Sequence, residues 1–252
     1  FEKEYLERSS VVIRAFYPAP YRLSSDQIDF LHTTAGETCH VEVLTLKDED
    51  WTHNWKAYYH TTRIGQSLVI KPSWEEYRSQ EDDLLIELDP GMAFGTGTHT
   101  TTRQCLEFIE VSLAEGQKVL DIGTGSGILA IAAAKLGAKE VTAIDNDPVA
   151  VKIAKQNVRQ NGLEDQVTVE LQDLAGFTGV EFDLVTANLT APILSRLIDR
   201  IVSLTRSGGR IITAGIGREQ WLKLRELIEQ KGLELEQISE EEDWVAVQVR
   251  RI

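Results

Sequence analysis

The chain has few cysteines and no long hydrophobic run. Its two cysteines, Cys39 and Cys105, lie far apart with no CxxC motif, which argues against a disulfide framework or a structural zinc site and favours two reduced thiols. No stretch approaches the roughly 18 consecutive apolar residues that span a bilayer. The chain does not open with a basic segment followed by an apolar core, the pattern of a secretory signal. We therefore expect a cytoplasmic protein with no membrane partner and no metal.

Basic residues are also scarce. There are 26 Lys and Arg against 40 Asp and Glu, a formal net charge of −14. The basic residues do not cluster, whereas acidic ones do at 48–50 and 240–243. Because proteins that grip a phosphate backbone need a basic face, we expect no direct nucleic-acid groove. Small molecules or basic proteins are the favoured partners, and we expect a monomer.

The first 78 residues differ from the rest. Residues 1–50 predict a small α+β domain: a strand from Val11 that Pro18 stops, a short helix capped by Ser24, and a second strand over 41–45. Residues 51–78 form a connection with three tryptophans, which more often dock a helix than bind a ligand. Residues 79–252 form the main domain.

From residue 84 onward, strands and helices alternate. The predicted strands are Lys118–Ile122, Val141–Ile144, Val167–Leu171, Asp183–Ala187, Arg210–Ala214, Glu234–Ile238 and Val245–Val249, and the predicted helices are Ile128–Leu136, Pro148–Asn161, Ala191–Leu204 and Trp221–Lys231. Alternation with apolar strands indicates a parallel sheet covered on both faces. The last two strands lack a helix between them, so they form an antiparallel hairpin. This α/β pattern of seven mostly parallel strands resembles the Rossmann-like class I methyltransferase fold.

A glycine-rich loop follows the first of these strands. Gly123, Gly125 and Gly127 give a GxGxG pattern, whereas a dinucleotide fingerprint requires a third glycine where Ile128 stands. Asp121 precedes the loop, and its carboxylate would repel a pyrophosphate but attract an ammonium. S-adenosylmethionine has an amino-acid end and no phosphate, so the loop favours that cofactor.

Further polar residues follow the next three strands. Asp145 is expected to bind the ribose hydroxyls, with a turn-stabilising role as the alternative, because Asp147 already serves as helix N-cap. Asp173 is expected near the adenine amino group, although a solvated loop aspartate fits as well. Asn188, after the fourth strand, is either a helix cap or a contact to the reacting methyl or the incoming nucleophile.

Residues 88–102, LDPGMAFGTGTHTTT, form the most specific stretch. Together with the tryptophan-containing connection, they resemble the PrmA family, bacterial methyltransferases of ribosomal protein L11, over most of residues 50–252. The resemblance implies a substrate-recognition domain, a linker and a methyltransferase domain, and methylation of lysine side chains and an α-amine of a ribosomal protein. The family's recognition domain begins with a further strand and helix, so residues 1–50 would be an incomplete version.

The resemblance also implies site residues. The family's cofactor contacts fall on Thr102, Gly123, Asp145 and Asn188, and a loop of Phe94, Gly95 and Thr96 would fold over the cofactor. Asn188 would be catalytic by position. His99 is a candidate general base, with a structural role as the alternative. An RNA base methyltransferase and a non-catalytic cofactor-binding module for ribosome assembly are the rival functions.

Overall fold

The computed structural model describes residues 2–6, 10–14, 27, 33, 59–89, 97, 99–178 and 180–252, and the chain divides into two compact units, 1–54 and 55–252. In the first unit, β1 (Glu2–Leu6) and β2 (Ser10–Arg14) form an antiparallel pair. β2 overlaps the strand predicted from Val11. The helix predicted after Ser24 and the strand predicted over 41–45 fall largely or wholly outside the described residues. The domain boundaries at residues 50 and 78 stay predictions.

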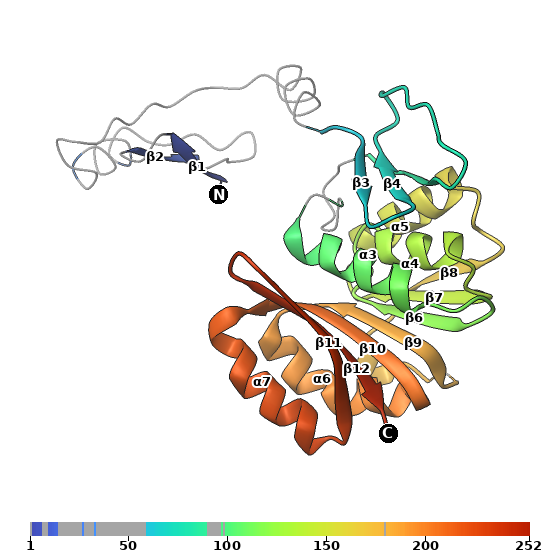
Figure 1. Ribbon diagram of the computed structural model, residues 1–252, viewed down its shortest axis with the longest axis vertical. Coiled ribbons are helices and arrows are strands. Elements are labelled where there is room, and N and C mark those ends of the chain that lie inside the picture. The colour runs from blue at the N-terminus through green and yellow to red at the C-terminus, as the bar shows by residue number, and fades with distance from the viewer. Residues whose placement is uncertain are drawn as a thin grey trace. The chain divides into compact units, whose positions relative to one another are not determined.

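The second unit is built on a seven-stranded sheet (Figure 1). Its strands are β6 (Lys118–Ile122), β7 (Glu140–Asp145), β8 (Val167–Leu171), β9 (Phe182–Asn188), β10 (Thr205–Gly217), β11 (Leu233–Glu241) and β12 (Trp244–Arg251). Their order is β11-β12-β10-β9-β6-β7-β8, and β12 is antiparallel to both of its neighbours. The predicted fold class is confirmed, including the terminal hairpin.

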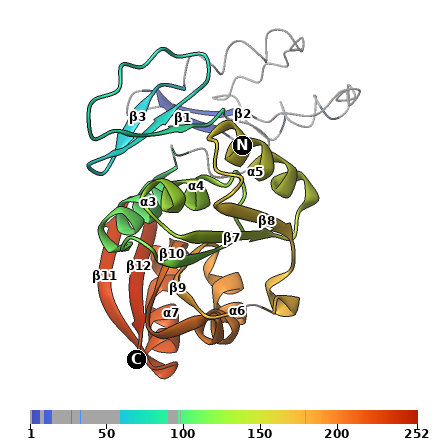
Figure 2. The same ribbon diagram turned by 90° about the vertical axis from the view of Figure 1, so that its right-hand side faces the viewer.

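Helices cover both faces of this sheet (Figures 1 and 2). α3 (Thr100–Ser112), α4 (Ile128–Lys135) and α5 (Pro148–Gln160) lie on one face, and α6 (Ala191–Leu204) and α7 (Arg218–Gln230) lie on the other. Each face has its own cluster of buried hydrophobic side chains. Strand order reverses at β6, which lies between β7 and β9. In open α/β sheets, ligands bind at the carboxyl ends of the strands beside such a reversal.

A second, smaller sheet includes part of the predicted connection. It consists of β3 (Thr62–Ile64), β4 (Leu68–Lys71) and β5 (Leu84–Glu87), with β3 antiparallel and β5 parallel to β4. The sequence indicated neither this sheet nor α3. Two of the three tryptophans, Trp51 and Trp55, lie outside the described residues.

Hydrogen bonds attach the small sheet to the main domain. The carboxylate of Glu110 on α3 accepts from the backbone N–H of Gln66 at 2.7 Å and of Ser67 at 2.6 Å. Partial burial raises the pKa of Glu110, but the hydrogen bonds from Ser67 and neighbouring backbone groups outweigh it and lower the pKa. At the other end, the Asn161 amide bonds to both backbone groups of Glu87, at 3.0 and 2.8 Å. The sheet is thus clamped between α3 and the end of α5.

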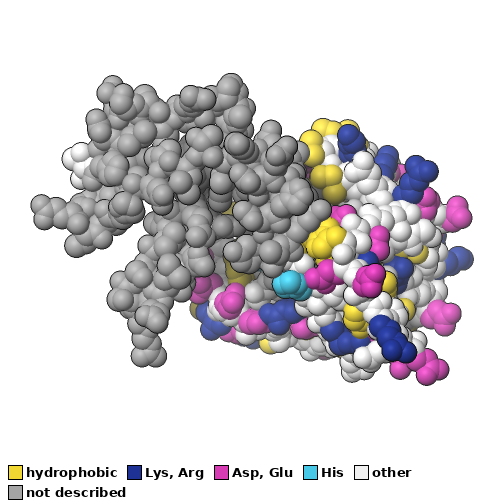
Figure 3. Space-filling model, turned by 90° about the horizontal axis from the view of Figure 1, so that it is seen from above, with side chains coloured by type: hydrophobic (Ala, Val, Ile, Leu, Met, Phe, Trp, Pro, Cys, Tyr) yellow, Lys and Arg dark blue, Asp and Glu magenta, His cyan; other side chains and the backbone are white. Residues whose placement is uncertain are grey.

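The described residues hold neither a membrane-spanning helix nor a metal-binding cluster. Within them, no helix has both the length and the apolar character needed to cross a membrane. The same residues contain no group of three or more His, Cys, Asp or Glu side chains arranged to hold a metal ion. Acidic and basic side chains are interspersed on the described part of the face shown in Figure 3.

Candidate active site

The glycine-rich loop joins β6 to α4 at the carboxyl edge of the sheet. The backbone N–H groups of Gly123 and Thr124 both donate to the carbonyl of Ile144 on β7, at 2.9 and 3.0 Å. Gly123 has a φ of +68°, and a Cβ placed there would lie 2.7 Å from the Leu189 side chain. The positive φ favours glycine at this position, because side chains rarely adopt it. The loop therefore offers a surface of backbone atoms that a cofactor can approach closely.

Asp121 lies beneath this loop and is buried. Its two carboxylate oxygens accept hydrogen bonds from the hydroxyls of Thr124 and Thr186, each at 2.6 Å. The pKa of Asp121 is raised to about 6, because burial and the negative charge of Asp145 raise it by more than the two hydroxyls lower it. Sequence reasoning missed Thr186, because no motif links a threonine inside β9 to a carboxylate on β6. The attraction of Asp121 for a cofactor ammonium stays a prediction.

Asp145 ends β7 and holds the turn that follows. One of its oxygens accepts from the Gly125 backbone N–H at 3.0 Å and the other from the Asp147 N–H at 2.9 Å. Asp147 in turn caps α5 by accepting from the Val149 N–H at 2.8 Å, as the sequence predicted. A carboxylate has about four acceptor positions, so Asp145 retains capacity for ribose hydroxyls beside its structural bonds. The two alternatives left open by the sequence are compatible.

Asp173 lies at the end of the next strand along the edge. Its side chain is exposed and accepts from the Ala175 N–H at 2.8 Å, which caps the short 3₁₀ helix η3 (Leu174–Gly176). The backbone of the preceding residue, Gln172, donates to the Asp145 carbonyl at 2.9 Å. The polar ends of β7 and β8 are therefore adjacent, while the contact of Asp173 with adenine stays a prediction.

Asn188 ends β9 on the other side of the glycine-rich loop. Its side-chain Nδ2 donates to the Thr102 hydroxyl at 3.4 Å, across 86 positions of sequence. Thr102 is fully buried in the first turn of α3. The structure therefore brings together two residues that only the family resemblance had paired. Asn188 does not cap α6, whose N-cap position is Thr190.

His99 has a structural role at the start of α3. It is the N-cap residue, and its Nδ1 accepts from the Thr101 backbone N–H at 3.3 Å. Its ring packs edge-on against Trp244, with centroids 5.5 Å apart. The adjacent Thr100 hydroxyl donates to Glu242 in the β11–β12 turn at 3.0 Å. The acidic run at 240–243 is thus partly bonded to α3 rather than only solvated.

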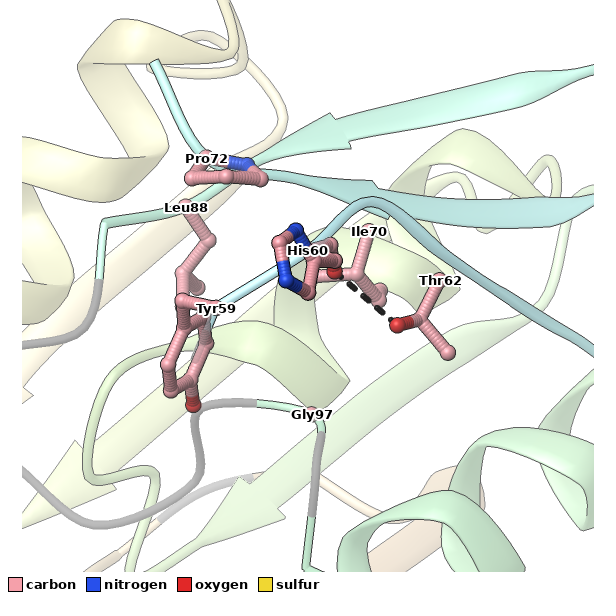
Figure 4. A pocket seen from close by; sticks show the side chains of 7 residues that line it. All are labelled: Tyr59, His60, Thr62, Ile70, Pro72, Leu88 and Gly97. Carbon is pink, nitrogen blue, oxygen red and sulfur yellow. Dashed lines mark hydrogen bonds between the residues drawn. The ribbon is translucent and has the colours of Figure 1, made fainter. Parts of the chain in front are cut away.

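Part of the predicted lid falls outside the description. Phe94, Gly95 and Thr96 are not among the described residues, but Gly97 is. Gly97 has a φ of +89°, and a Cβ there would lie 3.2 Å from Ile128 and 3.3 Å from Ile70. Figure 4 shows Gly97 at a small pocket whose other lining residues are Tyr59, His60, Thr62, Ile70, Pro72 and Leu88. Gly97 therefore lies between β4 and the start of α4.

Known proteins resemble the chain over nearly its whole length. The crystal structure of ribosomal protein L11 methylase from Lactobacillus delbrueckii subsp. bulgaricus matches with a TM-score of 0.72 and 34% identity, covering 77% of this chain and 99% of that one. Ribosomal protein L11 methyltransferase from Syntrophomonas wolfei is 40% identical over 252 residues, 98% of this chain and 82% of the relative. The enzyme of that name from Exiguobacterium sp. is 43% identical over 257 residues, 98% of this chain and 81% of the relative.

The fold, the glycine-rich loop and these relatives define the chain as an S-adenosylmethionine-dependent methyltransferase. A sequence model described as Ribosomal protein L11 methyltransferase (PrmA) matches residues 1–252. The chain belongs to the PrmA family, and the resemblance noted in its sequence is confirmed.

The site fits this cofactor. Its loop has glycine at positions 123, 125 and 127, and Asp121 and Asp145 supply negative charge. The segment 121–127 contains no lysine or arginine that would favour a phosphate.

Proposed function

We propose that this protein transfers methyl groups from S-adenosylmethionine to amino groups of ribosomal protein L11, on lysine side chains and the α-amine. The names of the relatives support the substrate, and the chain spans most of their length. The observation that carries the proposal is the Asn188 amide, which lies at the carboxyl end of β9 and is bonded to Thr102. The amide oxygen there can accept a hydrogen bond from an amine N–H. This would orient the amine beside the cofactor and leave its lone pair free to attack the methyl group.

The cofactor would lie across the carboxyl ends of β6 and β7. Gly123 and Gly125 would give it backbone contacts, and Asp145 would accept from its ribose hydroxyls. Asp121 would supply negative charge towards the ammonium of the methionine part, and Asp173 would lie near the adenine. Phe94, Gly95 and Thr96 would cover the bound cofactor and exclude water.

The bound cofactor supplies an electrophilic methyl on a sulfonium, and the protein has to align an amine with it. The amine must be neutral to attack, so a lysine ammonium first releases its proton. Desolvation lowers the pKa of an amine, and the partly buried Leu189 beside Asn188 contributes an apolar surface there. Asn188 would then hold the neutral amine in line, so catalysis is chiefly by position.

A methyl-transfer assay with competing acceptors tests this function. The enzyme is given cofactor with a tritiated methyl group, separated ribosomal proteins and ribosomal RNA in one reaction. We expect label on L11 alone, and mass spectrometry should find it on lysine side chains and the α-amine. An Asn188→Ala variant is assayed alongside at saturating cofactor and should label L11 much more slowly.

Each alternative result has a distinct meaning. Label in RNA would replace the substrate class and leave the fold and cofactor assignments standing. Cofactor binding by calorimetry without label in any acceptor would favour the non-catalytic module. Label on L11 that is equally strong with Asn188→Ala would keep the function but remove Asn188 from the mechanism.

A further inference from the structure

Gly215 lies in β10 next to the end of β9. The pairing of β10 with β12 shifts register between Thr213 and Ile216, and Gly215 within this bulge has a φ of +81°. Beside it, the Leu189 backbone N–H donates to the Ala214 carbonyl at 3.1 Å. At this bulge, β10 therefore lies directly beside the residues that immediately follow β9.

The space beside Gly215 is filled by backbone. A Cβ at this position would lie 2.7 Å from the Leu189 carbonyl oxygen, 3.0 Å from its carbonyl carbon and 3.3 Å from Oδ1 of Asn188. Real Cβ atoms do not approach backbone this closely, and a backbone carbonyl cannot rotate away as a flexible side chain can. Any side chain at 215 would displace the segment that carries Asn188.

Leu189 transmits that contact to the cofactor loop. Its carbonyl lies against Gly215, while its side chain lies 2.7 Å from where a Cβ of Gly123 would be. Leu189 is thus enclosed between Gly123 of the glycine-rich loop and Gly215 of β10, both with positive φ. The adjacent Asn188 is further restrained by its hydrogen bond to Thr102.

We propose that Gly215 is a positioning residue for methyl transfer, which sets the Asn188 amide and Leu189 against the glycine-rich loop. The inference rests on the proposed role of Asn188 and extends it to a residue that touches neither cofactor nor acceptor. Gly123 and Gly125 lie in the loop after β6 and Asp145 ends β7, so a change at 215 should alter the transfer rate more than cofactor affinity.

The chain contains a matched control for this inference. Gly208 lies in the same strand with a φ of +74°, but nothing lies within 4 Å of a Cβ placed there. Gly208→Ala and Gly215→Ala therefore share the backbone strain of an L residue at positive φ, and differ in the contact with Leu189. Comparing the two separates positioning from general destabilisation.

The first readout divides rate from binding. We expect Gly215→Ala to lower the single-turnover methyl-transfer rate roughly 100-fold relative to Gly208→Ala, since small misplacements of reacting groups have effects of this size. The cofactor dissociation constant, measured by calorimetry, should agree between the two variants within about threefold. Equal rates would overturn the inference, as would a rate loss fully explained by weaker cofactor binding.

The second readout does not depend on activity. The methyl resonances of Leu189 and the side-chain amide resonances of Asn188 are compared by NMR. They should match wild type in Gly208→Ala and move in Gly215→Ala, with loss of the Leu189–Gly123 contact. Unchanged resonances in Gly215→Ala would overturn the inference, even in an enzyme that labels no acceptor.

A third variant locates the contact. Leu189→Ala removes the side chain but leaves the carbonyl against Gly215, so the Asn188 amide resonances should stay near their wild-type positions. If they shift as far as in Gly215→Ala, leucine packing rather than Gly215 sets the amide, and the inference fails. A wild-type enzyme that does not label L11 would refute the proposed function while these resonances still decide the positioning.

Discussion

The carboxyl edge of the main sheet has two halves that are held in different ways. At the ends of β6 and β7, carboxylates bond to backbone N–H groups and hydroxyls at 2.6–3.0 Å, as with Asp121 and Asp145. At the ends of β9 and β10, Asn188 donates a longer hydrogen bond to the Thr102 hydroxyl, at 3.4 Å, and Leu189 packs closely between Gly123 and Gly215.

The difference suggests a division of tasks. Charge-assisted hydrogen bonds are the stronger kind and fix geometry before a ligand arrives. The long amide–hydroxyl hydrogen bond holds the Asn188 side chain less firmly, so a bound acceptor can still adjust the position of that side chain. We therefore expect changes in the first half to alter cofactor affinity and changes in the second half to alter the transfer rate.

Asp145→Ala should have the largest effect. It leaves the N–H groups of Gly125 and Asp147 without their acceptor and removes the proposed ribose contact, so cofactor affinity should fall roughly 1000-fold, or about 4 kcal/mol. Calorimetry with S-adenosylmethionine measures the loss. Asp147→Ala is the control, because it removes only the cap of α5 and should cost about 1 kcal/mol of stability. Equal affinities for the two variants would refute the prediction.

Asp121, at the β6 and β7 half of the edge, should make the stability of the folded protein depend on pH. Its pKa is raised from 3.8 to about 6, chiefly by burial. Between these values the folded protein binds a proton that the unfolded chain has released, so this group's contribution to stability decreases as pH rises from about 4 to about 6. A shift of about two units corresponds to roughly 3 kcal/mol.

The Asp121→Asn variant isolates that contribution. Urea denaturation measures the free energy of unfolding of both proteins between pH 4 and pH 7.5. Relative to wild type, this free energy should rise by roughly 3 kcal/mol in the variant as pH increases across the range. Other carboxylates titrate equally in both proteins and cancel in the difference. A stability difference that does not vary with pH would show that the folded-state carboxyl titrates normally.

Asn188→Ala tests the second half directly. We expect the transfer rate at saturating cofactor to fall roughly 100-fold, a larger loss than the loss in cofactor affinity. Thr102→Val, which removes the hydroxyl acceptor, should give a smaller loss in the same direction, and Thr102→Ser should retain most of the rate. Single-turnover kinetics and calorimetry measure the two quantities. Wild-type turnover in Asn188→Ala would end the division of tasks proposed above.

Glu110→Gln should have the smallest effect. It weakens the hydrogen bonds that join the β3–β4 turn to α3 and should lower the free energy of unfolding by about 1–2 kcal/mol. Glu107→Gln is the matched control, since Glu107 lies one turn earlier on the same helix and does not bond to that turn. Denaturant titration compares the two. Equal stabilities would mean that packing alone attaches the small sheet.

The sequence predicted the large sheet because short apolar, β-branched segments alternate with helical ones along most of the main domain, and the last two strands follow each other directly. It did not predict α3, whose first turn consists of three threonines, β-branched residues with low helix propensity. The strands of the small sheet span only three or four residues. Such segments are too short for a periodic signal, and their pairing depends on neighbours distant in sequence.

The site residues were predictable where the spacing of residues near a strand end indicates them. The glycine-rich loop and Asp145 follow from strand ends, and Asp147 as a cap follows from the proline after it. Gly215 and Thr186 gave no such signal. Their roles depend on contacts between strands separated by many residues, and a register shift or a buried hydroxyl leaves no local pattern.

The partners of α3 have a consequence for how the protein is made. Thr100, Arg103, Gln104 and Ser112 bond to residues of β11, β12 and the turn between them, 135–142 positions later in the chain. On a translating ribosome, the helix carrying Thr102 emerges long before those partners are synthesised. The nascent chain can assemble β6, β7 and the cofactor loop early, whereas the acceptor side is completed only when the last strand is released. The contacts that hold α3 therefore form only after β11 and β12 have been synthesised.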